Sequence, residues 1–273
     1  MNASVAGQMR IRRRTRRYVC ALALLALTCA NCRTRQYGAL DSPRAAQLPP
    51  VMLWAWEQPA RLNFLDARAT GVAYLAATLR LRMGDVTLVP RMQPLEVPHG
   101  VLLLAVVRIE RDRREAAAPS YDDAQRARIV REVVAVQDAP GVRGVQIDFD
   151  AQGSEREFYR ALLDDLRRAL PPDKMLTMTA LASWCAGDNW LDGLPVDEAV
   201  PMLFRMGADT KAVLMRLADG RDFSSAICRH SYGVAVDENI VPPNFLNGRR
   251  RYVFNGKAWT RDSVTKALNG VEP

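Results

Sequence analysis

The stretch 144-GVQIDFDA-151 alternates apolar and polar residues, and its polar members are Gln146, Asp148 and Asp150. Successive side chains of a β-strand point to opposite faces, so the alternation predicts a strand with one apolar and one acidic face. Burying polar groups without partners costs free energy. We therefore expect the acidic face to line the open end of a larger sheet structure.

Seven further apolar runs along the chain have a strand-like pattern. They are 51-VMLWAWE-57, 71-GVAYLAATL-79, 101-VLLLAVVRIE-110, 175-MLTMTALASW-184, 200-VPMLFRM-206, 226-AICRHSYGV-234 and 251-RYVFNG-256. Between the runs, 121–139 and 154–170 carry apolar residues four apart, which is the helix period. Strands that alternate with helices predict parallel βαβ units, and eight strands predict an α/β protein with a (β/α)8 TIM-type barrel.

The predicted barrel is compact, with one or two helices missing or replaced. Residues 51–273 are few for eight complete strand-helix units, and 80–98 has the pattern of a hairpin rather than a helix. We expect 51–273 to form a single domain, which the polar, proline-ended segment 33–50 joins to the amino terminus as a linker.

Residues 1–32 predict an export signal. Six arginines between Arg10 and Arg17 precede the apolar run 18-YVCALALLALTCA-30, and this run is shorter than the roughly 20 residues that span a membrane. Cleavage after Ala30 and lipid attachment at Cys32 remain alternatives, as does an uncleaved anchor or buried helix. The expected location is periplasmic, extracellular or lipid-anchored to the envelope.

The positive charge of the chain belongs largely to this signal. Removing its six arginines lowers the formal net charge from +8 to +2, and no dense basic stripe remains, so we predict no nucleic-acid partner. The barrel contains Cys185 and Cys228, and the sequence leaves open whether they pair.

Polar and aromatic residues gather at the predicted strand ends, where barrels of this type have their active sites. The candidate catalytic residues are Asp148, Asp150, Glu57 and Glu110. The candidate substrate-binding residues are Trp54, Trp56, Arg108, Gln146, Trp184, Arg205 and His230. Each of these could also be structural, because strands that run out into solvent carry charges at little cost.

Carboxylate pairs are the groups that hydrolyse glycosidic bonds, and aromatic faces stack on sugar rings. We expect Asp150 to be the general acid, with a pKa raised by burial and by the charge of an ionised Asp148. Glu57 or Glu110 would supply a base or nucleophile. Arg205 would bind an anionic sugar or hold the aspartates ionised.

A metal site is the competing interpretation of the two aspartates, because the pattern D-x-D can hold Mg²⁺ or Mn²⁺. Nucleotide-sugar donors are scarce outside the cytoplasm, and the chain has only two histidines. We predict no metal and no cofactor.

The strand 144-GVQIDFDA-151 resembles the signature D-G-x-D-x-D-x-E of glycoside hydrolase family 18, the chitinase barrels. Aligned on Gly144, Gln146 takes the place of the first inner aspartate, Asp148 matches the second, and Asp150 takes the place of the acid glutamate. The resemblance implies that the last acid protonates the glycosidic oxygen and that Asp148 positions an acetamido group. The run 202-MLFR-205 is similar to the M-x-Y-D of that family's sixth strand, with phenylalanine and arginine at the last two positions.

A second resemblance extends over most of the predicted barrel. It rests on 54-WAWEQP-59, 104-LAVVRIE-110, 145-VQIDFDA-151, 180-ALASWCAGDNWLDGLPVDEAVPMLFRMG-207 and 253-VFNGKAW-259, which resemble the bacterial domain of unknown function 3142. This resemblance implies an exported or lipid-anchored small barrel.

Together these observations predict an exported, glycoside-hydrolase-like barrel that acts on a polysaccharide or other glycan, with a general acid from the Asp148/Asp150 strand. The alternative is a cell-envelope barrel that binds a glycan without cleaving it. Replacement of the signature's first aspartate and of its glutamate is also what a hydrolase that lost its activity would show.

Overall fold

The computed structural model describes residues 42–238 and 240–269, except for the side chain of Glu115. The predicted export signal and residues 33–41 of the predicted linker lie outside these ranges. Across the described ranges, every helix is too short or too polar to cross a membrane.

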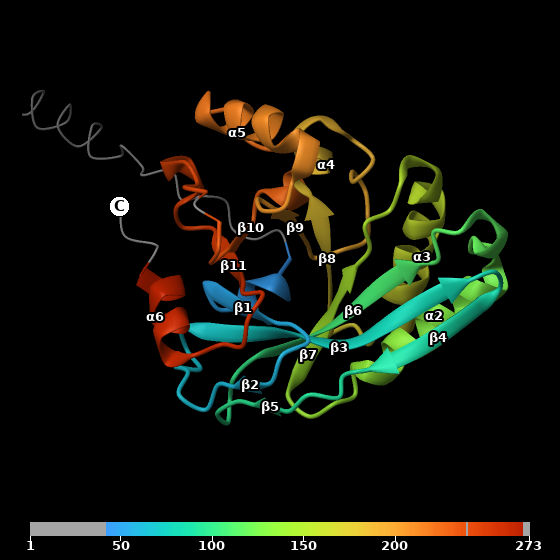
Figure 1. The fold of residues 1–273 in the computed structure, drawn as a ribbon, viewed down its shortest axis with the longest axis horizontal. Helices are drawn as coiled ribbons and strands as arrows, with labels where there is room; N and C mark the ends of the chain where they lie inside the picture. The colour runs from blue at the N-terminus through green and yellow to red at the C-terminus, as the bar shows by residue number, and fades with distance from the viewer. Residues whose placement is uncertain (1–41, 239, 270–273) are drawn as a thin grey trace, which may run out of the picture. The chain divides into compact units, whose positions relative to one another are not determined.

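Eight parallel strands form a closed barrel (Figure 1). In barrel order they are β1 (Val51–Ala55), β3 (Thr70–Arg82), β6 (Leu103–Arg111), β7 (Val142–Asp148), β8 (Met175–Leu181), β9 (Glu198–Met202), β10 (Ser231–Ala235) and β11 (Arg250–Phe254). Strand β1 pairs with both β11 and β3, which closes the ring. Each strand overlaps one of the eight predicted runs, although several of the ends differ, and the (β/α)8 prediction is confirmed.

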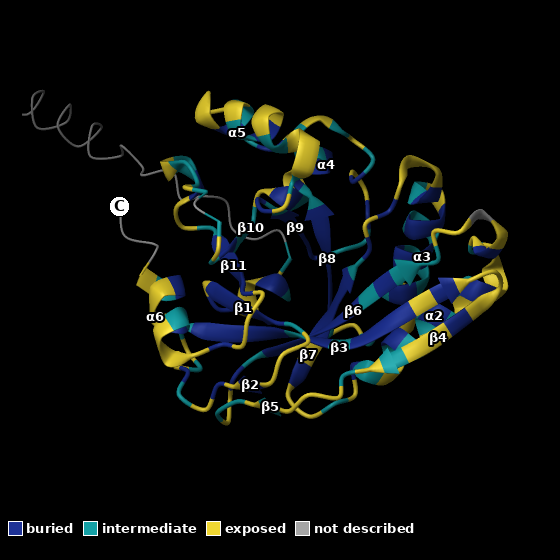
Figure 2. Cartoon of the chain, in the orientation of Figure 1, coloured by how far each residue is buried: buried dark blue, intermediate teal, exposed yellow. Residues whose placement is uncertain are grey.

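Five of the eight barrel strands, β6, β7, β8, β9 and β11, are followed by an α-helix in the described ranges. The helices are α2 (Asp123–Val136), α3 (Arg156–Ala169), α4 (Ala182–Gly187), α5 (Thr210–Ala218) and α6 (Arg261–Asn269). The first two lie where the sequence predicts them. Figure 2 shows the exposed residues on the outer sides of these helices, around strands that are mostly buried.

The connections after β1 and β3 contain strands and loops instead of helices. Strand β3 continues beyond the ring into an antiparallel hairpin with β4 (Asp85–Pro90), as expected for 80–98. The short strands β2 (Ala60–Arg61) and β5 (Leu95–Glu96) pair with each other. Among the described residues, the connections after β1 and β10 also contain no α-helix, so the simplification goes beyond the one or two helices expected.

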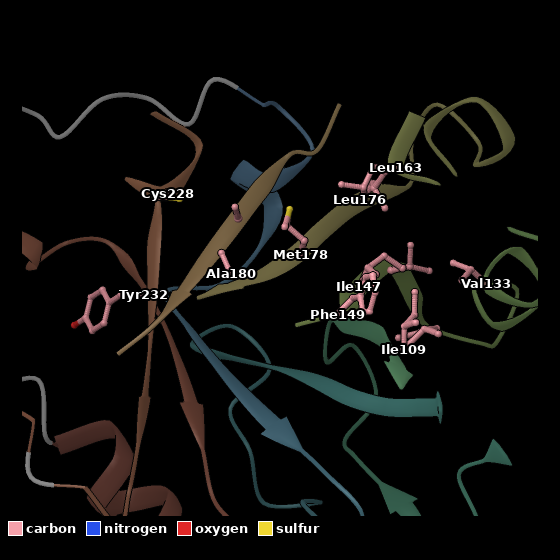
Figure 3. Packing of buried hydrophobic residues seen from close by; sticks show 14 of the residues in the cluster. Ile109, Val133, Ile147, Phe149, Leu163, Leu176, Met178, Ala180, Cys228 and Tyr232 are labelled. Atoms are coloured by element: carbon pink, nitrogen blue, oxygen red, sulfur yellow. The ribbon is translucent and has the colours of Figure 1, made fainter. Parts of the chain in front are cut away.

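Apolar side chains pack in two layers, one inside the barrel and one between the strands and the helices. On β7 and just after it, Ile147 and Phe149 belong to the outer layer (Figure 3). The Phe149 ring lies edge-on to Tyr159 of α3, with ring centroids 5.2 Å apart. Inside the barrel, the Trp54 indole donates a 2.7 Å hydrogen bond to the side chain of Gln146. The strand therefore has the two faces that its alternation predicts.

The amino-terminal mouth of the barrel is closed by residues that the sequence assigned to a linker. The buried Arg250 pairs with Glu198 at 2.7 Å and donates a 2.7 Å hydrogen bond to the carbonyl of Ala45. The Glu198 carboxylate also accepts a 3.0 Å hydrogen bond from the Tyr252 hydroxyl. Because a buried charge needs partners, this network fixes 42–50 against the barrel. The predicted domain bounds, a linker over 33–50 and a single domain over 51–273, stay a prediction.

Candidate functional site

A cavity of about 280 Å³ opens among the carboxyl ends of the strands. Its wall takes residues from β1, β6, β7, β8, β9 and β11 and from segments that follow several of them. This is the end of a (β/α)8 barrel at which active sites form, because the loops after the strands meet there. The buried network around Arg250 lies at the opposite end of the barrel.

Asp148 is the most buried carboxylate of the cavity, with 15% of its side chain exposed. Its Oδ1 accepts a 2.7 Å hydrogen bond from the Thr179 hydroxyl on the neighbouring strand. The pKa of Asp148 is raised to about 6. Burial is the main cause, the hydrogen bond from Thr179 opposes it, and the smaller effects of Asp150 and Arg108 raise and lower the pKa, respectively. The carboxyl group is therefore able to take up and release a proton near neutral pH.

Arg108 connects Asp148 with a second carboxylate. Its Nε lies 3.9 Å from Oδ2 of Asp148 and 3.3 Å from Oε1 of Glu110. The guanidinium also lies 6.0 Å from the ring centroid of Trp56. Arg108 thus partly neutralises two acids and contacts an aromatic wall of the cavity.

Asp150 follows the end of β7, and its side chain is exposed at the rim of the cavity. Its backbone is held from the neighbouring strand, because Arg111 donates a 2.9 Å hydrogen bond to the Asp150 carbonyl. Arg111 also pairs with the buried Glu155 at 3.2 Å. The sequence assigned a buried, proton-donating role to Asp150 and an ionised one to Asp148. The structure instead buries Asp148 and places Asp150 in solvent.

Four aromatic rings form the apolar side of the cavity: Trp54, Trp56, Phe204 and Phe254. Phe204 and Phe254 are stacked with centroids 5.4 Å apart, and Trp56 lies edge-on to Phe254 at 5.9 Å. Trp54 is buried beneath them, whereas Trp56 is half-buried. Of the predicted platforms, Trp56 is therefore the indole placed to contact a ligand, and Trp54 supports the floor.

Arg205 lies beside this aromatic group in a strained backbone conformation. It has a positive φ of 51°, which is uncommon for a residue other than glycine. Its backbone N–H donates a 3.1 Å hydrogen bond to the Glu238 carboxylate, and its guanidinium lies 4.8 Å from the Phe254 ring centroid. Strain of this kind is often kept at functional sites. The conformation places the Arg205 cation over the mouth of the cavity.

Five of the predicted site residues do not line the cavity. Glu110 lines a smaller neighbouring cavity that also has Arg108, Asp148 and Asp150 in its wall. Glu57 is exposed on the loop after β1, and Gln146 is fully buried below the floor against Trp54. Trp184 does not end strand β8 as expected. It lies in α4, is 5% exposed and packs on Trp190 in the outer layer.

His230 lies at the opposite end of the barrel. Strand β10 begins only at Ser231, so the expected strand 226–234 started too early and placed His230 within it. The histidine lines a separate cavity with Arg44, Arg167 and Asp197. Its position follows from the short 3-10 helix Ala226–Cys228, which occupies the start of the predicted strand.

Several cavity residues were not among the candidates from the sequence, notably Thr179, Phe204, Phe254 and Asp209. Thr179 had a detectable signal, because Thr177 and Thr179 alternate with apolar residues in β8 as the acids do in β7. Asp209 lies on a short 3-10 helix after β9, where no periodicity marks it. In the ranges 42–238 and 240–269, no group of three histidine, cysteine or acidic side chains is arranged to hold a metal ion.

A disulfide bond connects Cys185 with Cys228, which answers the question that the sequence left open. Both cysteines are fully buried. The bond ties α4, whose first residues Ala182 and Ser183 line the cavity, to the segment before β10. The wall of the cavity beside β8 is thereby held covalently.

Comparison with known proteins yields fold similarities alone. No family model and no curated protein matches the chain. A solved structure described as a candidate chitinase A from Streptomyces coelicolor is similar with a TM-score of 0.53 and 14% identity, over 81% of this chain and 97% of that one. The Bacillus cereus spore cortex-lytic enzyme SleL matches 68% of this chain and 50% of its own, with 14% identity and a TM-score of 0.42.

The likeness to the Streptomyces coelicolor structure agrees with the closed parallel barrel seen here. The resemblance to domain 3142 stays a prediction. In its fold, the chain is a (β/α)8 barrel similar to a chitinase-like protein.

Proposed function

We propose that this protein is a glycoside hydrolase that acts on a polysaccharide or other glycan, with Asp148 as the proton donor. The observation that carries the proposal is a buried carboxyl group with a pKa of about 6 at the floor of an aromatic-walled cavity, at the carboxyl end of a (β/α)8 barrel. A general acid works best when its pKa lies near the working pH.

Glycoside hydrolysis also needs a second group, which is usually a carboxylate. Asp150 and Glu110 are the candidates, because both accompany Asp148 around a shared charged cavity. Asp150 is exposed to the water that would take part in the reaction. In this proposal Asp148 protonates the glycosidic oxygen, and Asp150 or Glu110 acts as base or nucleophile. The roles of the two aspartates are thus exchanged relative to those that the signature resemblance implies.

The aromatic side of the cavity supports a sugar as the ligand. Trp56 and Phe254 present apolar ring surface beside charged hydrogen-bonding groups, and a pyranose ring offers the same combination of C–H faces and hydroxyl groups. Arg205 and Arg108 supply donors at the rim. Trp54, Gln146 and Trp184 take supporting positions in this proposal, and His230 takes none at the site.

An exported location fits the chemistry of the cysteines. Disulfide bonds persist in the periplasm and outside the cell and are rare in the cytosol, and Cys185 and Cys228 form one. Together with the predicted signal over 1–32 and the resemblance to domain 3142, this supports a protein that is secreted or attached to the envelope through a lipid on Cys32.

The test is the release of new reducing ends from a panel of polysaccharides: chitin, peptidoglycan, cellulose, xylan, polygalacturonate and alginate. We expect the mature protein to cleave at least one, and Asp148→Asn to lose at least about 100-fold of that rate. Asp173→Asn is the control, because Asp173 is exposed before β8 at the other end of the barrel. Cleavage by Asp148→Asn at the parent rate would contradict the proposal.

A second candidate function is glycan binding without cleavage. The composition of the β7 strand favours it. This strand supplies one buried carboxylate, that of Asp148. Gln146 stands in place of a second acid, and its side chain accepts a hydrogen bond from the Trp54 indole. Binding of a panel member by the parent protein, with no product formed over a wide pH range, would favour this candidate over hydrolysis.

A further inference from the structure

Two arginines line the cavity that contains Asp148, and they differ in their partners. The Nε of Arg108 lies 3.9 Å from a carboxylate oxygen of Asp148 and 3.3 Å from one of Glu110. The guanidinium of Arg205 lies over the Phe254 ring instead, and among the described residues no acidic side chain pairs with it. The sequence allowed Arg205 to bind an anionic sugar or to hold the aspartates ionised. Its contacts favour the first of these roles.

The backbone of Arg205 is fixed at the mouth of the cavity. Its φ of 51° lies in the left-handed region, which residues other than glycine rarely adopt. Both oxygens of the Glu238 carboxylate accept from its backbone N–H, at 3.1 and 3.3 Å, and Glu238 belongs to the segment after β10. A costly conformation that is held from a second segment gives the side chain a defined starting point.

The guanidinium of Arg205 is also held at its far end. It lies 4.8 Å from the centroid of the Phe254 ring, and this ring stacks on Phe204. A Cβ atom at Gly256 would lie 3.5 Å from Nη2 of Arg205, so the guanidinium lies close to the chain after β11. An arginine that is already ordered in this way loses less conformational freedom when it binds a ligand.

The charges of the cavity wall favour a ligand group with a single negative charge. Besides Arg205 and Arg108, the wall carries Asp148, Asp150 and Asp209. Three acids would repel a group with two charges, such as a phosphate monoester, whereas one guanidinium can offer two parallel N–H donors to one carboxylate. The aromatic rings of the same cavity suit the C–H face of a pyranose. A sugar that carries one carboxylate therefore matches both parts of the wall.

We propose that the cavity is selective for acidic glycans and that Arg205 binds the carboxylate of a uronic acid unit. This inference rests on the proposed function and narrows its substrate class from glycans in general to glycans that contain uronic acids. The carboxylate accepts two N–H donors from the guanidinium, while the sugar ring occupies the cavity that Arg205 and Asp148 line.

Methyl esterification of the ligand tests the charge without changing the sugar. Calorimetry compares trisaccharides of galacturonate, mannuronate and glucuronate with their methyl esters, in an Asp148→Asn background that prevents cleavage. We expect the acid of at least one series to bind about tenfold or more tightly than its ester, because the ester loses a charge-assisted hydrogen bond. Addition of Arg205→Gln should bring the ratio of the two affinities close to one. Arg205→Lys should keep part of the ratio, because lysine retains the charge without the paired donors.

Arg261→Gln is the matched control. Arg261 is also exposed and also lies over an aromatic ring, 4.5 Å from the centroid of Phe64, but it is outside the cavity. Its variant should keep the ratio of the background protein. Equal affinities for acid and ester in every series, or equal ratios in the Arg205→Gln and Arg261→Gln variants, would overturn the acidic preference and leave the proposed function standing.

An absence of binding in all three series would also overturn the acidic preference. The proposed function would be contradicted as well only if the parent protein released no reducing ends from any polysaccharide of the panel, so the two failures are distinguishable.

Discussion

At the scale of single residues, the free energy of ionising Asp148 determines how the site responds to pH. Burial raises its pKa from 3.8 to about 6, so the ionised form destabilises the folded protein. The stabilising contribution of the protonated form is complete below about pH 4 and is lost as the pH rises through 6. Since one pKa unit corresponds to about 1.36 kcal/mol, this contribution is at most roughly 3 kcal/mol.

Asp148→Asn should therefore increase the stability of the protein above pH 6, because asparagine avoids the cost of a buried charge. We expect a gain of up to about 3 kcal/mol in the free energy of unfolding at pH 7.5, shrinking towards zero near pH 4. Urea unfolding of both proteins across this pH range measures the difference. A gain that does not change with pH would show that Asp148 does not titrate as the geometry indicates.

Thr179 supplies the second residue-scale prediction. Its hydroxyl donates to the ionised Asp148 and thereby lowers the pKa of that carboxyl. Thr179→Val should move the titration of Asp148 to higher pH, which NMR of the carboxyl carbon can follow. Thr177→Val is the control, because Thr177 is buried on the same strand but bonds the Val145 carbonyl instead. Equal titration curves for all three proteins would count against the assigned contact.

At this scale the sequence predicted the acids and aromatics more reliably than their surroundings. The period of two in β7 identified Asp148 and Asp150, because alternation fixes which side chains share a face. It could not predict which aspartate would be buried, since this depends on where β7 ends relative to its neighbours. Thr179 and Phe254 come from strands that are distant from β7 in sequence, and their contacts with the site depend on the register of the closed barrel.

At the scale of elements, the close contact of β7 with β8 depends on a glycine. A Cβ atom on Gly144 would lie 2.4 Å from the carbonyl oxygen of Met175 and 2.8 Å from its Cα, both in the backbone of the adjacent strand. The strands could accept a side chain there only by moving apart. Because β7 carries Asp148 and β8 carries Thr179, any such movement would also alter the site.

Gly144→Ala should lower the free energy of unfolding by about 1 to 3 kcal/mol, the usual cost of overpacking a buried position. Chemical denaturation measures the change. The matched control is Gly153→Ala, since a Cβ atom at Gly153 would have no neighbour within 4 Å. Similar stabilities for the two variants would mean that β7 and β8 tolerate separation.

Element boundaries were harder to predict from the sequence than the elements themselves. The run 175–184 continues beyond β8 because the apolar residues of α4 extend the same pattern, and this misplaced Trp184. The run 226–234 included a 3-10 helix, and this misplaced His230. In both cases a short apolar helix lies next to a strand. The helix is too short for its hydrophobic periodicity to be distinguished from that of the strand.

At the scale of the whole molecule, the disulfide bond stabilises the half of the barrel that has short helices. The sequence separation of Cys185 and Cys228 is 43, and closing a loop of that length restricts the unfolded chain. The double variant Cys185→Ser/Cys228→Ser should therefore lose about 2 to 4 kcal/mol of unfolding free energy. Denaturation of the parent protein with and without a reducing agent is the companion measurement. An unchanged midpoint in both experiments would contradict this role.

The most direct test of the central claim is the pH dependence of kcat/KM on whichever polysaccharide the panel identifies. If Asp148 is the proton donor of a glycan-cleaving site, kcat/KM falls as the pH rises through about 6, because the donor must be protonated in the free enzyme. Thr179→Val should move this fall to higher pH, and Asp148→Asn should abolish it together with the activity. A rate that stays constant or increases from pH 5 to pH 8, or that survives the Asp148→Asn substitution, would contradict the account.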